Sequence, residues 1–180
     1  QVITGNNNFQ YLTLDNNFGL TLLSGTQKVY GTLALKAGNV NTNNRLVIGS
    51  NATYTGLIDE FSFGYTGGIV GNITVERYAN NTASSFFYIG APVGGAVISG
   101  WADDFSLATM NGATNGSQVI PTATCSPSAL AQGSPYGGLF DYRENTVNTC
   151  NLEGWHVRTT GAIVQGQGFI GRVPVGTVID

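Results

Sequence analysis

Few side chains in this sequence are capable of chemistry, and their spacing matches no catalytic motif. An acyl-transfer triad needs a nucleophile, a base and an acid that orients the base. The only histidine, His156, follows Trp155 in an apparent strand, and no Gly-x-Ser-x-Gly turn is present. We therefore interpret His156 as a satisfied or surface side chain, and we predict no catalytic residue and no enzyme activity.

The carboxylates are scattered along the chain. A glycosidase would need two of them across a cleft, and the candidates are Asp59, Glu60, Asp103, Asp104, Asp141, Glu144 and Glu153. Asp103 and Asp104, in a turn after Trp101, are candidates for calcium, and Asp141 and Glu144 could approach them. No Asp-x-Asp-x-Asp-Gly loop is present. We interpret Asp103 and Asp104 as a solvated pair that caps the turn. One histidine and two distant cysteines make no zinc site, so we predict no metal and no cofactor.

Two cysteines, Cys125 and Cys150, each lie in a polar, loop-like setting. In an oxidising compartment we predict that they form one disulfide, and the alternative is a pair of free thiols. The aromatic residues are a second group with two interpretations. They are either core residues or a platform for a sugar, and they comprise Phe86, Phe87, Tyr88, Trp101, Tyr136, Tyr142 and Trp155.

The composition narrows the class of protein. Charged residues make up 9% of the 180 residues, against about 25% in an ordinary soluble domain. Asn, Thr, Ser and exposed backbone must therefore supply solubility, which suits secreted and surface proteins. The net charge of −3 without a basic patch argues against nucleic acid as a partner. No apolar stretch approaches the roughly 20 residues of a membrane span. Because Gln1 is an improbable start, we expect a processed chain or a piece of a longer one.

The first part of the chain, residues 1–68, consists of short strands separated by Asn- and Gly-rich turns. Tyr11–Leu14 and Thr32–Leu35 lie 21 positions apart, which is about one coil of a β-helix. We predict a β-solenoid-like region in which each strand pairs with the one stacked above it. The asparagines suit its corners, because Asn tolerates a left-handed backbone and bonds its own turn. A meander of hairpins in a sandwich is the alternative.

The second part, residues 69–180, begins with the clearest strand in the sequence. Ile73 and Val75 alternate with Thr74 and Glu76, which predicts one face on a core and the other in water. Aromatic strands follow, separated by a long Gly/Ser/Thr-rich loop that carries Cys125. No window has a helical period. We predict an all-β chain whose second domain is an antiparallel β-sandwich with a long disulfide-bearing loop.

Several of these segments resemble a known family. The stretch Gly71-Asn72-Ile73-Thr74-Val75-Glu76-Arg77-Tyr78, the aromatic strand after it and Ala91-Pro92-Val93 resemble a recurring segment of Bacteroidetes surface proteins. These proteins are exported by the type IX secretion system and include gliding-motility adhesins. The tail, with Gly154-Trp155 and Gly166-Gln167-Gly168-Phe169, is similar too. The resemblance rests on structural motifs, so it implies an architecture more than an activity.

Composition and resemblance together predict a non-catalytic structural or adhesive module at the cell surface. Its partners would be neighbouring modules or subunits of one surface assembly or filament, joined by strand addition. The alternative is a carbohydrate-binding module that uses exposed aromatics, with calcium as an aid and surface glycans as partners. A small β-sandwich hydrolase is the third and least favoured hypothesis.

Overall fold

The computed structural model describes residues 1–59, 64–80, 85–104, 138–142 and 155–180. Within these ranges the chain is all-β apart from one short 3-10 helix, η1 (Ile98–Trp101), which confirms the predicted class. The chain divides into two compact units, Gln1–Ala79 with Val178–Asp180 and Asn80–Thr177. In the part of the chain that the structure describes, no helix is long and apolar enough to cross a membrane.

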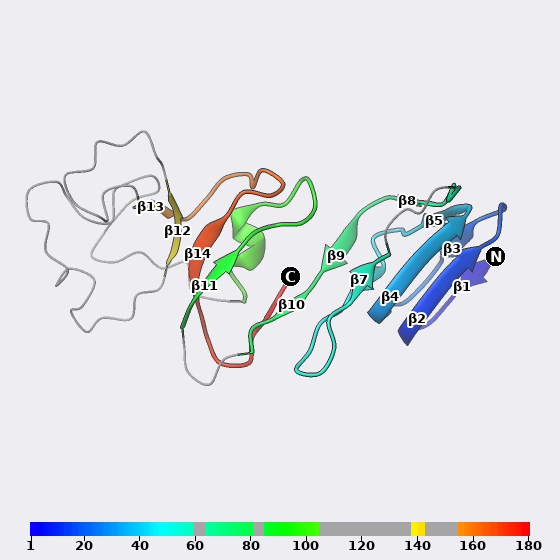
Figure 1. Ribbon diagram of the computed structural model, residues 1–180, viewed down its shortest axis with the longest axis horizontal. Coiled ribbons are helices and arrows are strands. Elements are labelled where there is room, and N and C mark those ends of the chain that lie inside the picture. The colour runs from blue at the N-terminus through cyan, green and yellow to red at the C-terminus, as the bar shows by residue number, and fades with distance from the viewer. Residues whose placement is uncertain (60–63, 81–84, 105–137, 143–154) are drawn as a thin grey trace, which may run out of the picture. The chain divides into compact units, whose positions relative to one another are not determined.

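The first unit contains two parallel sheets, of order β1-β3-β5-β8 and β2-β4-β6-β9, with β7 also paired to β4 (Figure 1). The strands are β1 (Val2–Ile3), β2 (Asn7–Asp15), β3 (Leu20–Leu22), β4 (Gln27–Ala37), β5 (Asn39–Asn41), β6 (Leu46–Ile48), β7 (Leu57–Ile58), β8 (Gly68–Val70) and β9 (Ile73–Val75). The chain thus visits the two sheets in turn. Each stretch that adds one strand to both sheets is called a pass here, and β1–β2 form the first pass.

The register of the longest pair confirms the pairing expected from the repeat. β2 and β4 run parallel with Tyr11 opposite Thr32 and Leu14 opposite Leu35. The same apolar positions therefore recur one above another, and they bury a continuous core that residues of both sheets share. That core consists of Leu14, Leu20, Leu22, Val29, Leu33, Leu35, Val40, Leu46 and Ile48.

Strands β8 and β9 extend these parallel sheets. β8 pairs in parallel with β5, and β9 pairs in parallel with β6, with Ile73 opposite Leu46. The sequence predicts an antiparallel region from residue 69 onward, whereas both of these strands run parallel to their neighbours. The alternation of Ile73 and Val75 places both side chains against the core, as expected, but the same alternation suits a parallel or an antiparallel strand. After β9, strand β10 (Arg77–Tyr78) pairs antiparallel with β15 (Val178–Ile179).

The second unit contains an antiparallel sheet of order β11-β14-β12-β13. Its strands are β11 (Ser85–Ile89), β12 (Leu139–Tyr142), β13 (Trp155–Arg158) and β14 (Phe169–Val173). Leu139, Phe169 and Val173 are fully or almost fully buried, as is Ile98 of η1. Most of the predicted long loop, with both Cys125 and Cys150, lies outside the described residues, so the disulfide stays a prediction.

Candidate functional site

His156 and Asp141 lie in the interior of the second unit. His156 of β13 lies opposite Asp141 of β12, and the two residues are 7% and 6% exposed. Of the two interpretations of His156, a satisfied side chain or a surface one, the surface position is wrong, because the β12–β13 pairing places the residue in the interior. Asp141 Oδ2 lies 3.7 Å from Nη1 of Arg158, which is half-buried, so this buried acid belongs to an ion pair. Such a pair needs its partner to balance the cost of burial, which favours a structural role.

Among the remaining described carboxylates, Asp103 and Asp104 each offer an oxygen within 4.8 Å of the other. Asp103 is exposed and Asp104 is half-buried, both in the turn after η1, as expected of a pair at a turn. Asp59 is half-buried after β7 in the first unit. Glu60, Glu144 and Glu153 lie outside the described residues.

The described aromatic candidates form two groups, apart from Phe87 of β11, which is half-buried on the opposite face of the strand from Phe86 and Tyr88. Trp101 is 6% exposed and meets Phe169 edge-on, with ring centroids 5.8 Å apart, so it is a core residue. A second group shares one face of the antiparallel sheet, because Tyr88 and Phe140 both lie opposite Ile170 and side chains alternate along each strand. This aromatic face consists of Phe86, Tyr88, Phe140 and Tyr142. Tyr136 and the Trp155 side chain are outside the described part.

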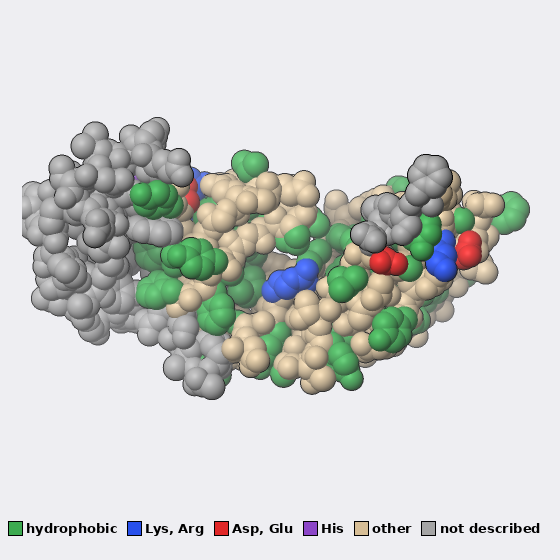
Figure 2. All heavy atoms as spheres, viewed as in Figure 1, with side chains coloured by type: hydrophobic (Ala, Val, Ile, Leu, Met, Phe, Trp, Pro, Cys, Tyr) green, Lys and Arg blue, Asp and Glu red, His purple; other side chains and the backbone are tan. Residues whose placement is uncertain are grey.

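Exposure on the aromatic face is uneven. Tyr88 is 82% exposed, and Phe86 and Tyr142 are about half exposed, while Phe140 is buried beside Phe86 with ring centroids 6.4 Å apart. The view in Figure 2 shows few charged side chains on the described surface, which is mostly uncharged polar groups and backbone. The aromatic face can therefore offer apolar contact.

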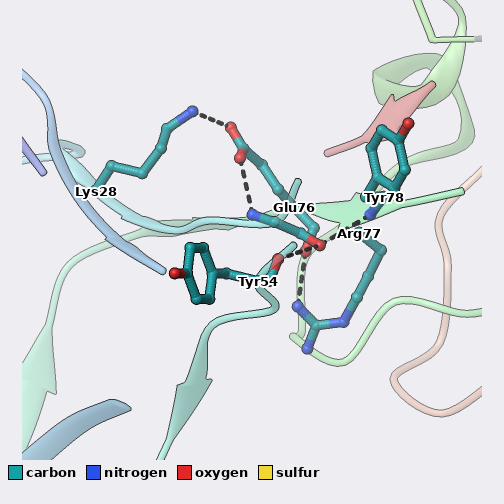
Figure 3. Close-up of polar contacts among 6 residues, drawn as sticks. Lys28, Tyr54, Glu76, Arg77 and Tyr78 are labelled. Atoms are coloured by element: carbon teal, nitrogen blue, oxygen red, sulfur yellow. Dashed lines mark hydrogen bonds and ion pairs between the residues drawn. The ribbon is translucent and has the colours of Figure 1, made fainter. Parts of the chain in front are cut away.

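The first unit contains a polar cluster around Glu76 that no sequence pattern predicts. Glu76 follows β9 and was expected to face water, yet it is 8% exposed. Its carboxylate accepts a hydrogen bond from Lys28 Nζ at 2.6 Å and another from the Ser50 backbone N–H at 3.2 Å (Figure 3). The prediction for Glu76 was wrong because the Lys28 partner lies 48 positions away in the chain.

The Glu76 cluster joins several strands. Ser50, after β6, accepts the Tyr78 N–H on its hydroxyl at 3.0 Å, and Arg77 Nη1 donates to the Glu76 carbonyl at 2.7 Å. Burial alone would lower the pKa of Lys28, but the hydrogen bond and charge of Glu76 and a smaller effect of Tyr30 outweigh burial, so the pKa is raised above 10.5. Both oxygens of the Glu76 carboxylate accept a hydrogen bond, one from Lys28 and one from Ser50. This arrangement favours a structural role, in which Glu76 links β4, β6 and β9.

Side chains in the turns and at the first residues of β2 and β4 form hydrogen bonds from one pass to the next. Asn43 and Asn44 have the left-handed backbone expected of corner asparagines, and Asn16 bonds its own turn. Polar side chains also form hydrogen bonds to a neighbouring pass, which the sequence pattern does not indicate. Those bonds run from Asn7 Nδ2 to Gln27 Oε1, from the Thr26 N–H to Asn6 Oδ1, from Asn43 Nδ2 to the Leu22 carbonyl and from Thr42 Oγ1 to the Asn72 carbonyl.

One sheet edge of the first unit is long and open within the described residues. β2 ends the sheet order β2-β4-β6-β9, and it is nine residues long (Figure 1). Along it Asn8, Gln10, Tyr11, Thr13 and Asp15 are exposed.

Two turn glycines of the first unit differ in the space around them. A Cβ at Gly25, in the second pass, would meet the backbone of Gly5, whereas a Cβ at Gly5 would meet nothing within 4 Å.

Comparisons with known proteins identify no relative: no family model, no curated protein and no solved structure matches this chain.

Proposed function

We propose that this chain is a non-catalytic structural or adhesive module of a larger cell-surface protein or surface filament, located outside the cell. Its first unit is a β-solenoid in which each pass is one coil, and its second unit is an antiparallel β-sandwich. Its partners are neighbouring modules or subunits of the same assembly.

One observation carries the proposal. In the first unit, apolar residues stack into a shared core while Asn7, Gln27, Asn43 and Thr42 bond from one pass to the next. The buried Glu76 is likewise engaged by Lys28 and Ser50. Polar side chains placed in this way hold a stack together, as in solenoids whose repeats contact only their neighbours. The resemblance to exported Bacteroidetes surface proteins and the low content of charged residues, 9%, support a location at the cell surface.

Protease treatment of intact cells of the producing organism tests this proposal. Peptides of this sequence should be released into the supernatant and identified by mass spectrometry, together with peptides of the longer protein or filament that contains it. A cytoplasmic protein digested in parallel serves as the control and should release nothing. Peptides that appear only after the cells are lysed would overturn the proposed location.

A carbohydrate-binding module is the second candidate, and the aromatic face favours it. Tyr88 and Phe86 are exposed on one face of the sheet, and an aromatic ring offers flat apolar contact with a polar tip in the case of Tyr. Binding of surface glycans to the wild type and to Tyr88→Ala, measured on a glycan array, tests it. Tyr54→Ala removes an exposed aromatic of the first unit and is the matched control. Equal binding by all three proteins would count against the aromatic face as the sugar site.

A further inference from the structure

We propose that the first pass binds another β-solenoid coil, which a neighbouring module of the assembly supplies with its strands parallel to β1 and β2. This inference rests on the proposed function, because it names the contact through which such modules assemble. β1 and β2 stand at the ends of their sheet orders, so within the described residues one side of each strand is unpaired (Figure 1). Another extended backbone is the partner that satisfies the N–H and C=O groups on that side.

The core side chains of the first pass are only half-buried, whereas their partners in the second pass are 0% exposed. The pairs are Ile3 with Leu22, Phe9 with Val29 and Leu12 with Leu33. The second pass lies between two other passes, and the first pass has a neighbour on one side alone among the described residues. A further coil would bury the three half-buried side chains, and burial of apolar surface drives association.

The stacking within the unit shows which coil fits. β2 pairs with β4 in two regular stretches, Asn7–Phe9 and Tyr11–Leu14, with a register shift between them. The third pass is divided at the same place, because β6 pairs with Gln27–Val29 and β7 pairs with Thr32–Leu33. A parallel coil with this division therefore matches β2 stretch by stretch. In this register core-facing side chains lie opposite core-facing ones, as they do throughout the unit.

Gly5 leaves room for the backbone of the partner. Gly5 and Gly25 occupy corresponding corners of the first two passes, and both have positive φ (76° and 70°). A Cβ at Gly25 would meet the Gly5 carbonyl, whereas a Cβ at Gly5 would meet nothing within 4 Å. The corner of the incoming coil would thus lie against Gly5 in the way that Gly5 lies against Gly25.

The chemistry of this end defines its partner. β2 contains no lysine or proline, the residues that commonly protect an edge strand, and its one charge, Asp15, is the last residue. The partner is a coil of two short strands joined at a corner, with apolar side chains toward the core and a backbone carbonyl beside Gly5. Because the two surfaces in this contact differ, the contact is heterologous and can repeat into an array.

Hydrogen exchange of the native particle, compared with that of the isolated full chain, tests the inference. The Asn7 N–H donates to the Thr26 carbonyl of the second pass. Successive N–H groups in a strand point to opposite sides, so the Asn8 N–H points toward the place of the incoming coil. The Asn8 amide should exchange at least about tenfold more slowly in the particle than in the isolated chain.

Gly5→Ala provides a variant with a matched control. Its methyl group would occupy the place of the partner backbone, so the Asn8 amide of the variant particle should lose its added protection. Gly166→Ala introduces the same group at a glycine of similar φ (79°), also with nothing within 4 Å, in the second unit. It should keep the protection. Circular dichroism of both isolated variants verifies that they fold.

The outcomes distinguish this inference from the proposed function. An Asn8 amide that exchanges equally fast in a large particle and in the isolated chain would overturn the coil contact alone, as would protection that persists in Gly5→Ala. A lone chain as the native form would overturn the proposed function and this inference with it. Protection that appears in the isolated chain as its concentration rises would make a second copy the occupant and so contradict a coil from a neighbouring module.

Discussion

Replacement of Glu76 tests whether its buried cluster holds the first unit together. Glu76→Ala removes the acceptor for Lys28 Nζ and leaves the Ser50 N–H without its carboxylate partner. A buried donor without an acceptor costs about 1–3 kcal/mol. The Lys28 side chain keeps 26% exposure, so the lost ion pair adds only about 1 kcal/mol. The expected loss in free energy of unfolding is therefore about 2–4 kcal/mol.

Glu76→Gln separates the two contributions. The amide oxygen still accepts from the Ser50 N–H, so the expected loss is only about 1 kcal/mol from the ion pair. Asp15→Asn is the matched control, because Asp15 is an exposed acid of the same unit and its replacement should stay within about 0.5 kcal/mol.

The assay can resolve the first unit from the second. Both tryptophans, Trp101 and Trp155, lie in the second unit. In a urea titration, hydrogen exchange measured on peptides from residues 1–79 monitors unfolding of the first unit. Tryptophan fluorescence monitors unfolding of the second unit. The variants should shift the first transition and leave the fluorescence transition in place. A Glu76→Ala protein as stable as Asp15→Asn, or no more affected than Glu76→Gln, would refute the structural role assigned to the cluster.

Three further predictions use other features of the two units. Gly25→Ala should destabilise the first unit more than Gly5→Ala, by urea unfolding, because both glycines have positive φ (70° and 76°) but only Gly25 has backbone in the way of a Cβ; equal losses would contradict this. The raised pKa of Lys28 contributes stability below pH 10.5 that is lost as the pH rises through the folded-state pKa. Raising the pH through this range should therefore lower the free energy of unfolding of the wild type more than that of Lys28→Met. Parallel plots of this free energy against pH for the two proteins would contradict the prediction. In the second unit, Trp101→Ala should cost about 3–5 kcal/mol in urea unfolding, whereas Val164→Ala, at a 70% exposed position, should change little; a small loss at Trp101 would place it outside the core.

The strands of the first unit were predictable because apolar residues recur at a fixed distance. Tyr11–Leu14 and Thr32–Leu35 carry the same alternation 21 positions apart, and the parallel register pairs those residues. The direction of β9 was not predictable, since alternation has the same period in parallel and antiparallel strands. Pairing with β6 depends on a partner 27 positions earlier, as in Leu46 opposite Ile73.

Buried polar side chains were the hardest feature to predict. Glu76 occupies a polar position of an alternating pattern, and such a position usually faces water. Its ion-pair partner, Lys28, lies far away in the chain, in β4. His156 becomes buried only through the pairing of β13 with β12, which no local pattern indicates. The burial of Trp101, by contrast, follows the ordinary preference of a large aromatic side chain for the core.

The size of the native particle is the most direct test of the central claim that this chain works within a surface assembly. Material released from the outside of intact cells without denaturant can be fractionated by size-exclusion chromatography and probed with an antibody against this chain. The account predicts that the antibody detects a particle much larger than one chain, visible as an array or filament by electron microscopy. A lone, freely diffusing protein of 180 residues as the only native form would contradict it.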